Sequence, residues 1–186
     1  MRHLSIFLFI IISTTVFAGD YYEPNIDTYD PATGLYYKAV EESPEEGNFL
    51  SSKASHNIVL NIAIFDPAKG TYNLLFKEPQ KSGISIVLFE TGFKEGSIEF
   101  NGSTYSRLVL NNTQVAKRNL RDKLLVGVRN KELKSIILFV SDKKGGNLTK
   151  LAVIPYTADW HIDVKNSKLR VVHQTGKSIR IESFEW

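Results

Sequence analysis

The chain has 186 residues, of which 42% are hydrophobic and 23% charged, and these values exclude a disordered or collagen-like chain and fit one globular domain. It contains no cysteine, which excludes disulfides, thiolate metal sites and a cysteine nucleophile. The formal net charge of +3 is only mildly basic.

The first eighteen residues have the three-part pattern of a secretory signal peptide. A short basic start precedes a nearly unbroken apolar run over residues 4–12, and Val16 and Ala18 then place small side chains at the −3 and −1 positions of a cleavage site. The apolar run is too short to span the roughly 30 Å hydrocarbon core of a bilayer comfortably. We therefore predict cleavage after Ala18 and a secreted or periplasmic mature domain, residues 19–186, without a membrane span. An exported chain without cysteine fits a bacterial periplasm or medium better than a eukaryotic secretory route, where small domains often use disulfides.

Short apolar segments separated by turn signals predict a single all-β domain. The first hairpin is expected over residues 29–39, a basic loop over 113–123, and a turn at Glu90-Thr91-Gly92 that closes the strand before it. The other expected strands are 58–65, 72–76, 84–89, 97–100, 124–128, 135–140, 148–154, 160–164, 169–173 and 178–184.

The hairpin between residues 160–164 and 169–173 can be assigned a register from its sequence. A two-residue turn at Asn166 and Ser167 is expected between the strands. The pairs that this register predicts are Asp163 with Arg170 and Trp160 with His173. Side-chain period two then predicts one apolar face, formed by Trp160, Ile162, Val164, Leu169 and Val171.

An eight-residue segment occurs twice, at residues 29–36 and 65–72, with an aromatic residue, Asp-Pro-Ala, Gly and Tyr in the same places. The Asp-Pro-Ala-x-Gly turn after an aromatic strand end resembles the hairpins inside blades of Kelch-type and TolB-type β-propellers. The resemblance implies a small β-propeller or a propeller-like stack of antiparallel hairpins. A β-sandwich or barrel remains the alternative.

Acidic and basic side chains are unevenly distributed along the mature chain. Residues 19–100 carry 13 acidic and 6 basic side chains, whereas residues 101–186 carry 7 acidic and 16 basic. Packing of the two halves against each other explains this bias. The alternative is a basic face at Lys117, Arg118 and Arg121 for an anionic partner such as a lipid head group or a glycan. Nucleic acid is not expected, because this segment lacks the aromatic residues that stack on bases.

Asp159, His161 and Asp163 alternate along one strand and therefore point to one side. Such a trio can bind Zn²⁺ or Mn²⁺. Cross-strand pairing of Asp163 with Arg170 is the stronger interpretation, so we expect a polar binding surface here and neither a metal nor a cofactor. The acidic run Glu41, Glu42, Glu45 and Glu46 is interpreted as a solvated loop.

The expected function is that of an exported, non-enzymatic binding or interaction module of the cell envelope, with a protein or a glycan as partner. The tyrosines near the mature N-terminus are candidates for a carbohydrate surface or for strand packing; they are Tyr21, Tyr22, Tyr29, Tyr36 and Tyr37. A structural or assembly subunit of an envelope complex is one alternative. A hydrolase or lyase is the other, and it predicts a cleft in which at least two of Asp159, His161, Asp163 and the Glu41 to Glu46 group converge with perturbed pKa values.

Overall fold

The computed structural model describes residues 26–42, 58–103 and 114–186. Within these ranges the chain forms β strands and no α-helix, which confirms the all-β prediction. The predicted signal peptide and the residues Glu45 and Glu46 lie outside the described residues. The strands are β1 (Thr28–Tyr29), β2 (Tyr36–Glu42), β3 (Ile58–Asp66), β4 (Thr71–Leu74), β5 (Ile84–Lys94), β6 (Ser97–Ser103), β7 (Leu124–Asn130), β8 (Ser135–Ser141), β9 (Thr149–Pro155), β10 (Asp159–Asp163), β11 (Lys168–Thr175) and β12 (Ser178–Glu185).

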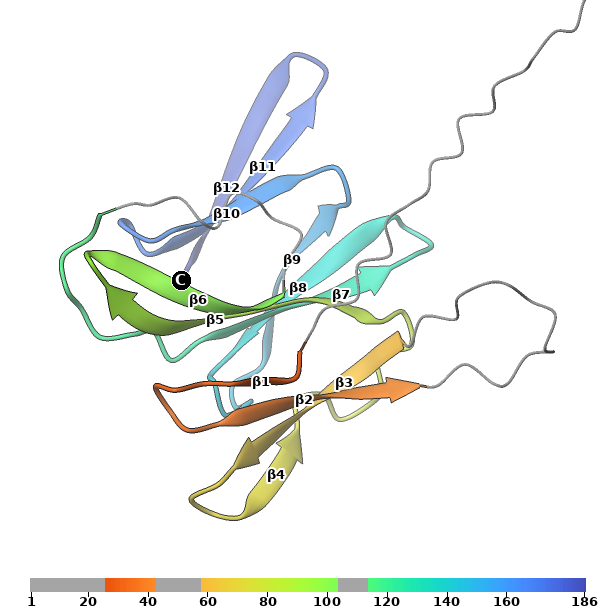
Figure 1. Cartoon of the computed structure of the whole chain (residues 1–186). Coiled ribbons are helices and arrows are strands. Elements are labelled where there is room, and N and C mark those ends of the chain that lie inside the picture. Colours follow the sequence, from red (N-terminus) through yellow and green to blue (C-terminus); the bar gives the residue numbers. More distant parts are fainter. Residues whose placement is uncertain (1–25, 43–57, 104–113) are drawn as a thin grey trace, which may run out of the picture.

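The described strands form three open antiparallel sheets (Figure 1). The first sheet has the order β1-β2-β3-β4, the central sheet β6-β5-β7-β8-β9, and the third sheet β10-β11-β12. The central sheet lies between the other two and packs on both faces, as sheets do in β-sandwiches. This arrangement does not single out a propeller, so the propeller-like part of the expectation stays a prediction.

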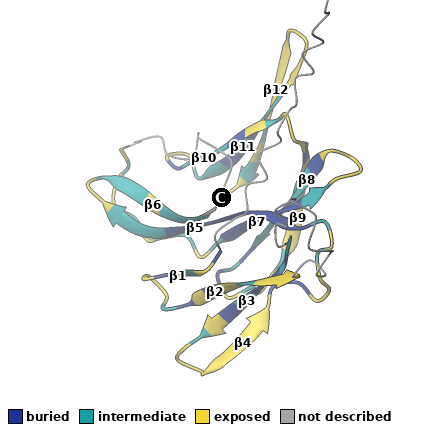
Figure 2. Ribbon diagram, turned by 45° about the vertical axis from the view of Figure 1, so that its right-hand side comes forward, coloured by how far each residue is buried: buried dark blue, intermediate teal, exposed yellow. Residues whose placement is uncertain are grey.

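Two hydrophobic cores result: the first core lies between the central sheet and the first sheet, and the second core lies between the central sheet and the third sheet. In β5, Val87 and Phe89 point into the core shared with the first sheet, whereas Ile86 and Leu88 point into the core shared with the third sheet. Strands β5 and β7 are therefore buried on both faces, as Figure 2 shows. Burial on both faces explains why their sequences are continuous apolar runs without alternation.

Gly127 in β7 lies close to isoleucine side chains of β5 and β8, the two strands that flank β7 in the central sheet. A Cβ atom added at Gly127 would lie 2.8 Å from Ile86 Cδ1 and 2.9 Å from Ile136 Cγ2. Gly127→Ala is therefore expected to lower the free energy of unfolding by about 1–3 kcal/mol through overpacking. Urea denaturation measures this change. A variant as stable as the original chain would show that the second core has unused space at this position.

The prediction of a turn at Glu90-Thr91-Gly92 is wrong. Strand β5 continues through this segment with a bulge between Glu90 and Gly92, and the hairpin turns at Glu95 and Gly96. Both turn residues adopt positive φ, 49° and 81°. The Glu-Thr-Gly segment remains extended because the carboxylate of Glu90 is buried and accepts hydrogen bonds from residues outside β5 and β6.

The register predicted for the last hairpin is also wrong, by two residues. Asp163 lies opposite Lys168, and Trp160 lies opposite Val171. The connection has four residues, because Ser167 adopts a positive φ of 53° and the carboxylate of Asp163 accepts a hydrogen bond from the backbone N–H of Asn166. A shift of two preserves side-chain alternation, so the predicted apolar face is confirmed as the buried one. His173 lies opposite Arg180 on β12 and not opposite Trp160.

Candidate functional site

Four exposed aromatic side chains form a row across the outer face of the first sheet. Tyr29 lies opposite Tyr36, Tyr36 opposite Phe65, and Phe65 opposite Tyr72. Their exposed fractions are 54%, 40%, 39% and 69% in that order. We call these four residues the aromatic row. It crosses all four strands, and at about 4.8 Å between neighbouring strands it is roughly 14 Å long.

The inner face of the two middle strands, β2 and β3, is buried at their row end, which establishes the direction of the row. Leu35, Tyr37 and Ile64 are the sequence neighbours of row residues, and each is at most 1% exposed in the first core. Since successive side chains of a strand point to opposite faces, the row residues point away from the central sheet. The row therefore lies on the outer face of a sheet whose inner side chains pack against the central sheet.

The internal repeat produces the row. Residues 29–36 and 65–72 each form a hairpin in which the Asp side chain accepts a hydrogen bond from the N–H two residues on, at 3.0 Å and 3.1 Å. The Gly of each turn adopts positive φ, 77° at Gly34 and 66° at Gly70. Each hairpin thereby places its two flanking aromatic residues opposite each other. Pairing of β2 with β3 then joins the two aromatic pairs into one line.

Two consecutive lysines hold the turns of these hairpins in place. Lys143 Nζ is 2.9 Å from Asp30 Oδ2, and both side chains are almost fully buried. Lys144 Nζ is 3.4 Å from Asp66 Oδ2 in an exposed pair, and its backbone carbonyl accepts a hydrogen bond from Asn73. These contacts restrict movement of the first sheet relative to the β8–β9 turn. They also join the acidic half of the chain to its basic half, as expected if the halves pack together.

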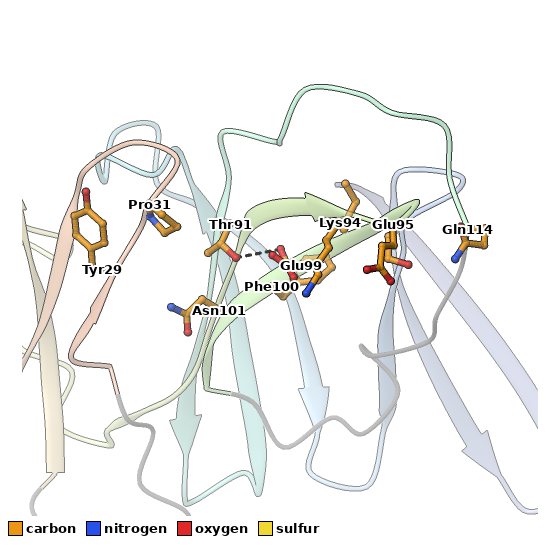
Figure 3. Close-up of a pocket in the computed structure, with 11 residues that line it drawn as sticks. Tyr29, Pro31, Thr91, Lys94, Glu95, Glu99, Phe100, Asn101 and Gln114 are labelled. Atoms are coloured by element: carbon orange, nitrogen blue, oxygen red, sulfur yellow. Dashed lines mark hydrogen bonds between the residues drawn. The ribbon is translucent and has the colours of Figure 1, made fainter.

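An open pocket of about 870 Å³ continues from one end of the row (Figure 3). It lies between the first hairpin and the β5–β6 hairpin, and Tyr29 belongs to both the row and the pocket wall. Most of its side chains are polar or charged. The lining residues are Tyr29, Pro31, Thr91, Lys94, Glu95, Ser97, Ile98, Glu99, Phe100, Asn101 and Gln114. The side-chain amide of Asn101 donates to the hydroxyl of Thr28, which ties the pocket wall to β1.

Four of the predicted site residues lie together on the outer face of the third sheet. Asp159, His161 and Asp163 alternate along β10, and Arg170 lies opposite His161 on β11. The predicted contact between Asp163 and Arg170 exists despite the different register, with Arg170 Nε and Nη2 at 2.9 Å and 2.8 Å from Asp163 Oδ2. Hydrogen bonds from Asn166 and then from Arg170 lower the pKa of Asp163 against a smaller opposing effect of burial. Among the residues that the structure describes, no group of three His, Asp or Glu side chains could hold a metal ion.

The hydrolase or lyase alternative predicted a cleft in which at least two of Asp159, His161, Asp163 and the Glu41 to Glu46 group converge. Glu41 and Glu42 end β2 in the first sheet, on the opposite side of the central sheet from β10. The pocket described here contains neither these glutamates nor the Asp159 to Asp163 group.

The three predicted basic residues have different environments. Arg118 forms a two-pronged ion pair with Glu90, with both N···O distances at 2.7 Å. Arg121 donates its backbone N–H to the same carboxylate at 2.8 Å and its guanidinium to Ser167. Lys117 is exposed. Two of the three thus contribute to contacts inside the protein, and an anionic partner for this segment stays a prediction.

The interpretation of the sequence identified two of the four residues in the aromatic row. Tyr29 and Tyr36 were among the candidate carbohydrate-binding tyrosines, but Phe65 and Tyr72 were not. The available signal was the repeat itself, because an aromatic residue precedes Asp and a Tyr lies two residues after Gly in both copies. Tyr37, another candidate, is buried and donates its hydroxyl to the carbonyl of Lys143.

Comparisons with protein-family models, with curated proteins and with solved structures find no match to this chain. Across residues 26–42, 58–103 and 114–186, no helix has the length and apolar character needed to cross a membrane.

Proposed function

We propose that the protein is an exported, non-enzymatic glycan-binding module of the cell envelope and that the aromatic row is its binding surface. The observation that carries this proposal is the in-register row of four exposed rings on one sheet face. Contiguous exposed apolar surface on a folded domain marks an interaction site. Export rests on the signal-peptide pattern of residues 1–18.

The geometry of the row favours a linear polymer. Rings on neighbouring strands recur at the regular spacing of the sheet, which suits a chain of repeated sugar units. Aromatic rings offer flat apolar area to the C–H faces of sugars, and the three tyrosines add hydroxyls at the rim for sugar hydroxyls. The row lies on strands and not on loops, so binding requires little ordering of the protein.

A charged pair and a polar pocket border the aromatic row. Next to the row, Lys38 lies opposite Ala63, and Ala63 lies opposite the exposed Leu74. Lys38 forms an ion pair with Asp27. The charged pair at the edge and the polar pocket beside Tyr29 provide hydrogen-bonding groups where a sugar chain leaves the rings.

Phe65→Ala tests the proposal because Phe65 occupies an inner position of the row and is accessible to solvent. Affinity electrophoresis of the mature domain in gels that contain a β-glucan, a xylan or a dextran, with sedimentation onto peptidoglycan sacculi, is expected to detect binding to at least one polymer. Loss of one stacked ring is expected to weaken that binding by about tenfold, or ~1.4 kcal/mol.

Tyr156→Ala is the matched control, since Tyr156 is an exposed aromatic residue directly after β9, outside the first sheet. It should bind like the original chain. Absence of binding to every polymer, or equal binding by Phe65→Ala and Tyr156→Ala, would contradict the proposal.

A further inference from the structure

Strand β12 forms an exposed edge of the third sheet. In the part of the chain that the structure describes, β12 pairs with β11 alone. The hairpin end of β11 and β12 projects beyond the other strands in Figures 1 and 2. Ile179 and Ile181 on this edge are 67% and 57% exposed. An exposed edge with apolar side chains is a template for pairing with another strand.

The turn of this hairpin determines which backbone groups face the open edge. Gly176, with a φ of 60°, and Lys177 form a two-residue turn between the paired residues Thr175 and Ser178. Such a turn closes on a hydrogen-bonded pair, and bonded and non-bonded pairs then alternate along an antiparallel ladder. Alternate residues from Ile179 onward therefore direct their N–H and C=O groups away from β11, and these residues are Ile179, Ile181 and Ser183.

The sequence of β12 is complementary to itself in antiparallel orientation. If Ile181 lies opposite Ile181 of the partner subunit, Arg180 lies opposite Glu182 of the partner subunit, and the reverse pair forms as well. Within one chain Arg180 Nη2 and Glu182 Oε1 are 2.8 Å apart, which shows that both side chains project from the same face of the strand. The pairing thus places opposite charges together on one face and isoleucines on the other, with no like charges in opposition.

We propose that this chain forms a two-fold symmetric homodimer by antiparallel pairing of β12 with β12 of a second copy, centred on Ile181. The pairing is isologous, because the same residues contribute from both copies. It involves about five residues of each strand, so the buried area falls below the roughly 1,200 Å² of stable interfaces. Dimerisation is therefore expected to depend on protein concentration.

The dimer keeps the proposed glycan-binding face accessible. The first sheet lies on the opposite side of the central sheet from β12, so both aromatic rows face outward. Two linked rows bind a repetitive polymer more tightly than one, because the second contact is intramolecular. The dimer itself does not rest on the glycan-binding proposal.

Sedimentation velocity of the mature domain without glycan, over a wide concentration range, tests the proposal. The original chain is expected to shift from monomer to dimer as concentration rises. Arg180→Glu places like charges together twice in each dimer and should weaken association by about tenfold. The double variant R180E/E182R restores opposite charges and should restore association. Lys131→Glu, the same charge change in the exposed β7–β8 turn, should leave association unchanged.

Ile181→Pro provides a second test, because it removes an N–H that points to the open edge and leaves the bonds to β11 intact. It should abolish dimerisation with little change in the circular dichroism spectrum. A monomer at all concentrations, or a dimer that persists in both Arg180→Glu and Ile181→Pro, would overturn the proposal. A double variant that associates no better than Arg180→Glu would also overturn it.

Discussion

Replacing Glu90 with alanine is expected to lower the free energy of unfolding by about 3 kcal/mol, because it leaves a largely buried guanidinium without its partner. The side chain of Glu90 is fully buried, and that of Arg118 is 23% exposed, so some rehydration keeps the loss near the lower end of the usual range. The same carboxylate accepts hydrogen bonds from the Arg121 backbone N–H at 2.8 Å and the Trp186 indole N–H at 3.0 Å. The variant therefore removes the acceptor of four hydrogen bonds, whose donors belong to three residues outside the central sheet.

Urea denaturation of Glu90→Ala beside Glu132→Ala measures this effect. Glu132 lies exposed in the β7–β8 turn, and its loss is expected to change stability by less than about 0.5 kcal/mol. Equal stabilities of the two variants would mean that the cluster of Glu90 with Arg118, Arg121 and Trp186 does not hold these residues against the central sheet.

The pH dependence of stability provides an independent check on the same cluster. Burial alone would raise the pKa of Glu90, but hydrogen bonds from Arg118, Arg121 and Trp186 outweigh it and lower the pKa below its ordinary value. Because the unfolded chain then takes up the proton first, the stability from Glu90 is present above the unfolded pKa of about 4.3 and is lost as pH falls through the lower folded value. The difference in the free energy of unfolding between the original chain and Glu90→Ala should therefore become smaller in acid.

Trp160→Ala is expected to lower the free energy of unfolding by about 3–5 kcal/mol, because it empties a large volume in the second core. Trp160 is only 4% exposed and belongs to the cluster that holds the third sheet on the central one. Thermal and urea denaturation measure the loss. Tyr156→Ala, four residues earlier but 46% exposed, is the control. A change for Trp160→Ala no larger than the control's would show that the third sheet does not depend on this ring for its packing.

The sequence predicted strands well where local patterning determines them. The predicted apolar face of the last hairpin is confirmed although the predicted register is wrong by two residues, because side-chain alternation also has a period of two. The continuous apolar runs of β5 and β7 identified them as strands, but the same runs did not show which sheets cover their two faces. That information depends on contacts between segments far apart in the chain.

The errors in the prediction have the same long-range origin. The segment Glu90-Thr91-Gly92 has the local pattern of a turn. Its residue Glu90 pairs with Arg118, which is 28 residues later in the chain, and this contact keeps the segment in an extended, buried strand. The repeat revealed both hairpins and their turn chemistry. It could not show that β2 pairs with β3, which is the step that aligns two aromatic pairs into one row.

The most direct test of the glycan-binding account is a nuclear magnetic resonance titration of the isotopically labelled mature domain with a soluble oligosaccharide from a polymer that it retains. The account predicts that the largest shifts fall on the ring protons of Tyr36, Phe65 and Tyr72 and on the amides of β2 and β3. Shifts confined to the outer face of the third sheet, around His161 and Arg170, or no shifts at saturating ligand, would contradict it.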